Sequence, residues 1–251
     1  MRIASLGSGS KGNATLVQHR ETTILVDNGF SLRRFQQRLQ RFEIEPKSID
    51  AVLLTHEHGD HSSGIERLCA NFGLPLWTAV GTARAALTPE FDYHRLVAGQ
   101  PVSIGAIDVL PVTVPHDASE PLQFIFQQAD SGKRLGILTD TGHITSHIVE
   151  AFGRLDALLL EFNYDAEMLA NGPYPDYLKQ RVGGNHGHLS NEQSLELLRR
   201  IDTSSLNCLI AAHISEKNNT AGIVDRLIRE LDNVPAPILA NQDTGFDWIT
   251  I

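Results

Sequence analysis

Residues 50–61 read Asp-Ala-Val-Leu-Leu-Thr-His-Glu-His-Gly-Asp-His, so an apolar stretch runs directly into three histidines and an aspartate. The apolar stretch predicts a β-strand. An extended continuation presents alternate side chains to one side, which would aim His56, His58 and Asp60 at one point. His61 would face the other side and could serve a second metal ion. Imidazole and carboxylate ligands suit zinc, iron or manganese. A histidine-rich polar loop is the alternative interpretation, but four ligand-type residues at this spacing favour a metal site.

The length and composition are those of an ordinary globular protein. The 251 residues are enough for one large domain or two small ones. The contents of 41% hydrophobic and 20% charged residues are also usual for such a chain. The sequence contains no linker, low-complexity stretch or clear break, so we predict a single domain over residues 1–251.

Charge and cysteine content limit the cellular compartments and the binding partners that fit this sequence. No charged-then-apolar leader opens the chain and no apolar run reaches membrane-spanning length, so we expect no membrane association. Cys69 and Cys208 lie in apolar contexts, which favours buried free thiols in a reducing compartment and hence a cytoplasmic protein. The net charge of −9 argues against a general affinity for polyanions. It does not exclude a phosphodiester substrate, because bound metal ions would dominate the local charge.

Strand and helix patterns alternate in both halves of the chain and predict sheets covered by helices, an α/β layered architecture. In the helix expected over Ser31–Phe42, Ser31 is a candidate N-cap. The arginines of this helix are most simply a solvated face, with nucleic-acid contact as the alternative. They are Arg33, Arg34, Arg38 and Arg41. The predicted strands lie near residues 2–6, 14–19 and 22–27, within 92–139, and at 156–161 and 206–211. The other predicted helices lie near residues 65–72, 145–152, 190–200 and 220–231.

Three later apolar strands each lead into a further ligand-type residue. His116 follows Val-Thr-Val-Pro, Asp140 follows Gly-Ile-Leu-Thr, and His213 follows Leu-Ile-Ala-Ala. Each of them alone could be an ordinary loop residue. Three strand-end ligands after a histidine cluster are hard to ascribe to chance, so we expect them to complete the metal site.

This pattern resembles the metallo-β-lactamase superfamily, and the resemblance extends over essentially the whole chain. It implies a four-layer αβ/βα sandwich with the site at one edge, between two sheets. It also implies a binuclear site for two divalent ions (zinc, manganese or iron), with a water shared by the ions as the nucleophile. The implied ligands are His56, His58 and His116 for one ion, Asp60, His61 and His213 for the other, and Asp140 as the bridge.

The sequence differs from other branches of the superfamily at two ligand positions, and these differences limit which branch it resembles. Asp140 stands where true β-lactamases of this fold usually carry cysteine, and His58 stands where flavin-partnered di-iron members carry glutamate. Five local motifs resemble instead the YycJ branch, also called WalJ or VicX, whose members are described as metal-dependent 5′-to-3′ DNA exonucleases. The motifs are Gly-Ser-Gly-Ser-Lys-Gly-Asn at 7–13, Thr-Asp-Thr-Gly at 139–142, Asn-Gly-Pro-Tyr-Pro at 171–175, Gly-His-Leu-Ser-Asn at 187–191 and His-Ile-Ser-Glu-Lys-Asn-Asn at 213–219.

The resemblance therefore implies a phosphodiesterase acting on nucleic acid, and three residues are catalytic candidates. Asp60 is one of them through its place in the metal site. His188 lies in a glycine-flanked turn, and a histidine in a similar Gly-His-Ser context is assigned as proton donor in the related tRNA 3′-processing enzymes. Glu161, at the end of an apolar strand, could orient His188. The alternatives are a backbone-bonded histidine at a helix start and a structural glutamate. We also expect Asp27, and in the same way Asp117, to orient ligand histidines.

The expectations about substrate contacts depend on residue composition alone. Segment 164–186 carries three of the four tyrosines close to cationic residues. We interpret it as a substrate flap in which tyrosines stack on unpaired bases and cations meet phosphates. A proline-stiffened loop whose tyrosines pack down is the alternative, as is a plain hairpin for the glycine-rich turn. The candidate contacts are Tyr174, Lys179 and Arg181 in this segment, and Lys11 and Asn13 in the glycine-rich turn.

Three functions fit these observations. The leading hypothesis is a binuclear metallohydrolase that cleaves phosphodiesters at DNA or RNA ends. The second is a hydrolase of a small cyclic phosphodiester or thioester, which the acidic charge and the lack of an added nucleic-acid domain would suit. A non-catalytic binding protein is the third, but such proteins usually lose metal ligands, and all seven are present here.

Overall fold

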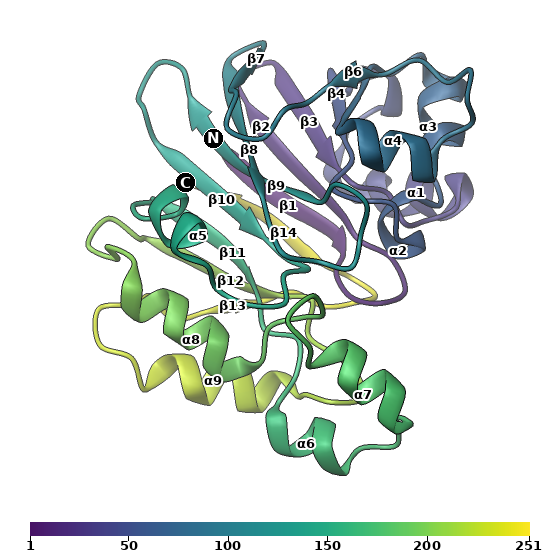
Figure 1. Ribbon diagram of the computed structural model, residues 1–251. Coiled ribbons are helices and arrows are strands. Elements are labelled where there is room, and N and C mark those ends of the chain that lie inside the picture. The colour runs from purple at the N-terminus through teal and green to yellow at the C-terminus, as the bar shows by residue number, and fades with distance from the viewer.

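Two seven-stranded sheets form the centre of the molecule in the computed structural model, which describes residues 1–251 (Figure 1). The first sheet contains β1 (Arg2–Gly7), β2 (Ala14–His19), β3 (Thr22–Val26), β4 (Ala51–Leu53), β5 (Leu76–Thr78), β6 (His94–Arg95) and β14 (Phe246–Thr250). The second sheet contains β7 (Val102–Ile104), β8 (Ile107–Thr113), β9 (Leu122–Gln128), β10 (Arg134–Leu138), β11 (Ala157–Glu161), β12 (Cys208–Ala212) and β13 (Ile238–Leu239).

Both sheets are mixed, with one antiparallel half and one parallel half. The strand orders are β14-β1-β2-β3-β4-β5-β6 and β13-β12-β11-β10-β9-β8-β7. In the first sheet β3, β4, β5 and β6 are parallel, and in the second sheet β10, β11, β12 and β13 are parallel. Because the carboxyl ends of parallel strands share one edge of a sheet, the residues that follow these strands are brought together there.

Helices cover the outer face of each sheet (Figure 1). On the first sheet lie α1 (Leu32–Leu39), α2 (Gly59–Ser62), α3 (Ile65–Phe72) and α4 (Val80–Ala86). On the side of the second sheet lie α5 (Ser146–Ala151), α6 (Ala166–Asn171), α7 (Asp176–Val182), α8 (Asn191–Arg200) and α9 (Ala221–Arg229).

Three apolar cores separate these layers. The inner core joins the facing sheets, and the two outer cores lie under the helices. Along β11, Leu159 belongs to the inner core, whereas Leu158 and Leu160 belong to the outer core beneath α8 and α9. A strand buried on both faces needs a continuous apolar run, which explains the sequence Ala-Leu-Leu-Leu. The arrangement confirms the predicted four-layer αβ/βα sandwich.

The structure corrects the prediction for the first helix. The segment Ser31–Phe42 is α1 followed by a 3₁₀ turn at Gln40–Phe42, and Ser31 takes the N-cap position without a side-chain cap hydrogen bond. Its arginines are not all a solvated face. The Arg38 guanidinium donates to the Leu6 carbonyl at 2.6 Å, and that of Arg41 donates to the Ser5 carbonyl at 2.8 Å. These two side chains fasten the helix to β1.

The start of α8 is secured by a capping box. The Ser190 hydroxyl accepts from the Gln193 N–H at 3.2 Å, and the Gln193 side chain accepts from the Ser190 N–H at 2.9 Å. We expect Ser190→Ala to lower the free energy of unfolding by about 1 kcal/mol, because an N–H of the first turn loses its partner. Urea unfolding would measure the change. Ser190→Thr, which keeps the hydroxyl, should retain most of the stability, and an equal loss in both variants would contradict this explanation.

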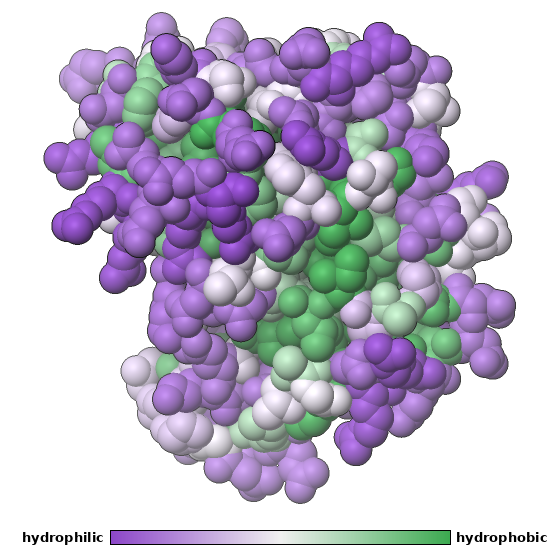
Figure 2. Space-filling model, turned by 180° about the vertical axis from the view of Figure 1, so that it is seen from behind, coloured by the Kyte–Doolittle hydropathy of each residue, from purple (hydrophilic) through white to green (hydrophobic).

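The surface seen from behind is largely hydrophilic, and apolar residues appear mainly in one hollowed stretch near its middle (Figure 2). No helix combines the length and the apolar character that crossing a bilayer requires. Cys69 and Cys208 are both buried and free.

Candidate metal centre

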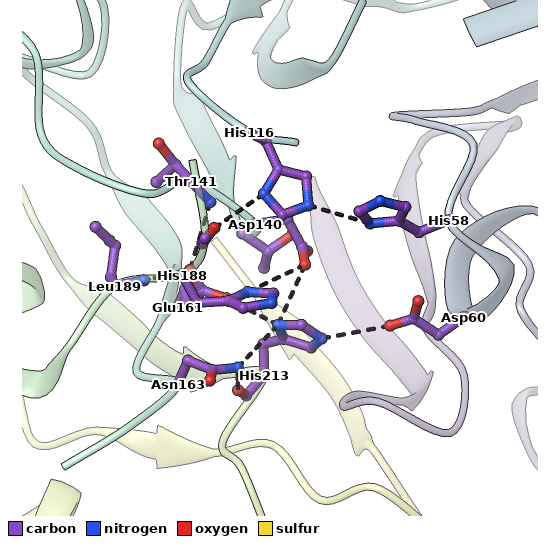
Figure 3. Close-up of polar contacts among 12 residues, drawn as sticks. His58, Asp60, His116, Asp140, Thr141, Glu161, Asn163, His188, Leu189 and His213 are labelled. Atoms are coloured by element: carbon purple, nitrogen blue, oxygen red, sulfur yellow. Dashed lines mark hydrogen bonds and ion pairs between the residues drawn. The ribbon is translucent and has the colours of Figure 1, made fainter. Parts of the chain in front are cut away.

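Seven ligand-type side chains converge at the edge where the parallel strands of both sheets end. Figure 3 labels five of them: His58, Asp60, His116, Asp140 and His213. The ligand atoms of His56, His58 and His116 form one group whose members all lie within 4.8 Å of one another. A second group, within the same limit, contains Asp60, His61 and His213. Asp140 lies between the two groups. It shares one cluster with His56 and His61, and another with His213.

The turns after the strands aim these side chains at the centre. Asp140 follows β10 and His213 follows β12, and both adopt the left-handed backbone conformation, with φ of 51° and 53°. Asp27, directly after β3, has φ of 60°. Aspartate and histidine are among the non-glycine residues that tolerate this region best, but it is still sparsely populated. Backbone strain therefore gathers at three strand ends that carry polar site residues.

One buried carboxylate orients two of the histidines. His61 Nδ1 donates to Asp27 Oδ2 at 2.7 Å. The Thr55 hydroxyl donates to the same oxygen at 2.8 Å and lies 2.9 Å from His56 Nδ1, from which it can accept. These bonds occupy the Nδ1 atom of both rings and leave each Nε2 directed toward the centre, as metal-binding histidines require.

Backbone carbonyls orient two more histidines. His116 Nδ1 donates to the Gly187 carbonyl at 2.9 Å, which leaves Nε2 for the site. His58 Nε2 donates to the Asp117 carbonyl at 3.2 Å, so this ring presents Nδ1 instead, 3.2 Å from His116 Nε2. The Asp117 carboxylate lies 3.5 Å from His58 Nε2 and accepts from Arg181 at 2.6 Å.

Glu161, fully buried at the end of β11, serves two histidines at once. Its Oε1 accepts from His213 Nδ1 at 2.8 Å and from His188 Nδ1 at 2.9 Å (Figure 3). Its Oε2 accepts from the Leu189 N–H at 3.0 Å. Nε2 of His188 makes no hydrogen bond within the protein, and the ring lines the central cavity. The structure thus brings together two of the three predicted catalytic residues, Glu161 and His188. The third, Asp60, lies on the other side of His213, with its Oδ2 3.6 Å from His213 Nε2.

The charges of the site match a cation. Asp140 Oδ2, His56 Nε2 and His213 Nε2 are buried and have no hydrogen-bond partner in the protein. Unpartnered buried polar atoms are costly unless a ligand satisfies them. Imidazole nitrogens and carboxylate oxygens are the donors that divalent zinc, manganese and iron accept. The residues therefore fit divalent metal ions.

The pKa values of the histidines shift in opposite directions in different parts of the site. Burial, followed by the neighbouring histidines, holds the pKa of His56 well below its ordinary value, which favours the neutral form that a metal ion needs. Burial also lowers the pKa of His213, but the carboxylates around it outweigh this effect and raise its pKa to about 10. The same balance between burial and the carboxylates of Glu161 and Asp140 raises the pKa of His188.

Asp27 allows a test of histidine orientation. Asp27→Asn keeps the size and tolerates the left-handed backbone, but it weakens the bonds that hold His56 and His61. We expect metal affinity to fall about 10- to 100-fold, the usual effect of removing such a partner. Chelator competition would measure it. Asp50→Asn is the matched control, because the Asp50 carboxylate also accepts a backbone N–H, from Thr23, but at the start of β4. Equal losses in the two variants would contradict the assignment.

A cavity of about 400 Å³ opens onto the candidate metal ligands. Of the predicted substrate contacts, Tyr174 and Arg181 line it. The structure does not place Lys179 there, because its Nζ donates to the Ala170 carbonyl at 2.7 Å and so joins α7 to α6. The segment predicted as a flap therefore contains two short helices, α6 and α7, joined by this hydrogen bond.

The glycine-rich turn also differs from the prediction. Lys11 is exposed and pairs with Glu216 at 2.6 Å, outside the cavity lining. Asn13 is buried. Its Nδ2 lies 3.3 Å from the Asp60 carboxylate and 3.1 Å from His61 Nε2, so it contacts the metal site itself. The turn thus supports candidate ligands through Asn13, whereas Lys11 lies outside the cavity lining.

Sequence reasoning missed two supporting residues of the site. The Ser8 hydroxyl accepts from the His213 N–H at 2.9 Å, and Thr55 links His56 to Asp27. The position of Thr55 directly before the histidine run was an available signal. No local signal points from Ser8 to His213, since 205 residues separate them.

Comparisons with known proteins agree with this geometry. Residues 22–214 match the sequence profile of the β-lactamase superfamily domain. The chain is 32% identical over 225 residues to the exodeoxyribonuclease WalJ of Streptococcus pneumoniae, covering 87% of this chain and 83% of that one. It is 30% identical over 224 residues to the exodeoxyribonuclease YycJ of Bacillus anthracis, covering 87% and 84%.

A solved structure shares the fold. The metallo-β-lactamase fold protein YhfI of Bacillus subtilis superposes with a TM-score of 0.75 over 99% of both chains, at 14% sequence identity. The architecture is therefore preserved where few residues are shared.

Proposed function

This chain belongs to the metallo-β-lactamase superfamily, in the branch of the WalJ and YycJ exodeoxyribonucleases, and from this premise we propose that it is a phosphodiesterase that removes nucleotides from nucleic-acid ends. The observation that carries the proposal is that seven ligand-type side chains converge beside one cavity. Four of them line it, together with His188, a histidine with one free ring nitrogen. The inner core shared by the two sheets supports a single hydrolase domain over residues 1–251.

The metal centre in this proposal is binuclear. His56, His58 and His116 would hold one divalent ion, and Asp60, His61 and His213 would hold the other, with Asp140 as the bridge. The two groups of ligand atoms support this division. Two bound ions would acidify a water molecule and offset the negative charge of the phosphoryl oxygens. Zinc, manganese and iron all suit these ligands.

His188 would protonate the leaving alkoxide. Its Nε2 has no protein partner, whereas its Nδ1 is bonded to Glu161, so the ring is held with one nitrogen available to a substrate. Glu161 would position the imidazole and favour its protonated form. A positioned acid of this kind usually contributes about 10²- to 10⁴-fold to the rate.

The first test is product analysis with the purified protein and added manganese. The substrate is a single-stranded DNA oligonucleotide that carries a 5′-phosphate and a label at its 3′ end. Stepwise shortening from the 5′ end would support the proposal and establish the polarity. An intact oligonucleotide, with metal shown to be bound, would contradict nucleic-acid cleavage and favour a small phosphodiester or thioester.

We also propose a cytoplasmic location. Two free, buried thiols support it, since a reducing compartment keeps cysteines unpaired. Fractionation of the producing cells would test this, and recovery in the extracellular medium would contradict it.

A further inference from the structure

Tyr177 is the only large hydrophobic side chain of the protein that is mostly exposed, with 73% of its surface open to solvent. It belongs to α7, the helix that also places Leu178 and Arg181 in the lining of the cavity. Single exposed apolar residues are common on protein surfaces. In this protein Tyr177 is the single such residue, and it lies on α7, a helix of the candidate site.

Helical geometry places Tyr177 beside Arg181. At about 100° per residue, Tyr177 lies about 40° from Arg181 around the helix axis and about 160° from Lys179. Lys179 marks the side of α7 that faces α6, because its Nζ donates to the Ala170 carbonyl. Tyr177 is therefore on the flank away from α6. In Figure 1, α7 lies below α2, and residues of both helices line the cavity.

Arg181 is held at the cavity by one hydrogen bond, and its other N–H donors are unoccupied. Its Nε donates to Asp117 Oδ2 at 2.6 Å, and neither terminal nitrogen makes a hydrogen bond within the protein. The side chain is 58% exposed. A guanidinium has five N–H donors, so one bond to Asp117 fixes the group and leaves the others for a phosphate.

We infer that the flank formed by Tyr177 and Arg181 binds the unpaired part of a nucleic-acid substrate, with a base stacked on Tyr177 and an adjacent phosphate on Arg181. Base stacking on aromatic rings beside a cationic track is the usual mode of single-strand binding. The inference rests on the proposed function and adds the substrate class. A base inside a blunt duplex is covered by its neighbours and cannot stack on Tyr177, so single strands and overhanging ends should be preferred.

The test compares Tyr177→Ala with Tyr177→Phe, and with Gln180→Ala as the matched control, since Gln180 is exposed on the face of α7 opposite Leu178. The substrates are a 5′-phosphorylated single strand, the same sequence as a blunt duplex, and bis(p-nitrophenyl) phosphate, which has no base. Tyr177→Ala should lower kcat/KM on the single strand about 5- to 150-fold more than on bis(p-nitrophenyl) phosphate, mainly through KM. Tyr177→Phe should keep the stacking, and Gln180→Ala should keep wild-type rates.

The salt dependence of kcat/KM distinguishes the phosphate contact of Arg181 from the base contact of Tyr177. Arg181→Ala should reduce the slope of log kcat/KM against log salt by about 0.7 on the single strand, because one phosphate contact is lost, whereas Tyr177→Ala should leave the slope unchanged. Equal single-strand rates with and without the Tyr177 ring would overturn this inference alone. A wild-type protein that hydrolyses bis(p-nitrophenyl) phosphate but leaves every oligonucleotide intact would overturn the proposed function as well.

Discussion

Replacing Asp140 with asparagine should lower phosphodiester hydrolysis at least about a thousandfold while the protein remains folded. Asp140 is 2% exposed, and its Oδ2 has no partner in the protein. Asparagine keeps the volume and tolerates the left-handed backbone at this position, but it lacks the negative charge that a bridge between two cations needs. A loss of several kcal/mol in transition-state stabilisation corresponds to at least about three orders of magnitude in rate.

Three measurements would define this variant: the initial rate on the labelled single strand, the metal content per chain, and urea unfolding. Asp156→Asn is the matched control, because the Asp156 carboxylate accepts the Arg134 N–H at 2.8 Å at the opposite end of the parallel strands. Wild-type turnover by Asp140→Asn would show that the carboxylate does not belong to the catalytic centre.

Replacing His188 with alanine should lower kcat on DNA about 10²- to 10⁴-fold without removing metal, because the proposed proton donor is lost but no ligand is. The loss should depend on the leaving group. p-Nitrophenolate leaves without a proton, so hydrolysis of bis(p-nitrophenyl) phosphate should be reduced at least about tenfold less than hydrolysis of DNA.

The control for His188 is His147→Ala, since His147 is an exposed histidine on α5. If His188→Ala lost activity equally on both substrates, the ring would act in binding or positioning and not as an acid. Loss of metal from this variant would place His188 among the ligands instead.

Strand and ligand positions could be read from the sequence because both depend on local pattern. An apolar run that fills two cores is recognisable without its neighbours, and β4, β11 and β12 were predicted on that basis. The residues that follow such strands, including Asp140 and His213, were recognisable as ligand types. Some short helices carried no comparable signal: α4, α6 and α7 were not predicted, although the equally short α5 was.

Lys179 and Asn13 show why the substrate side could not be predicted. A cationic residue near tyrosines in sequence could face a substrate or the protein, and only packing decides which. Lys179 joins two helices, and Asn13 contacts His61, 48 residues away. The residue composition of a segment does not show which residues its side chains contact in the folded protein.

The sequence by itself determined the α/β layered architecture and the identity of seven candidate ligands, because these follow from periodicity and from chemistry carried by single residues. The superfamily was indicated by the resemblance of its motifs. Tertiary structure alone decided which nitrogen of each ring faces the centre, that Glu161 serves both His188 and His213, and that Arg181 rather than Lys179 reaches the cavity. The physical reason is that most of these depend on a hydrogen bond between segments that are distant in the chain. Such bonds are set only when the two sheets pack and their strand ends meet.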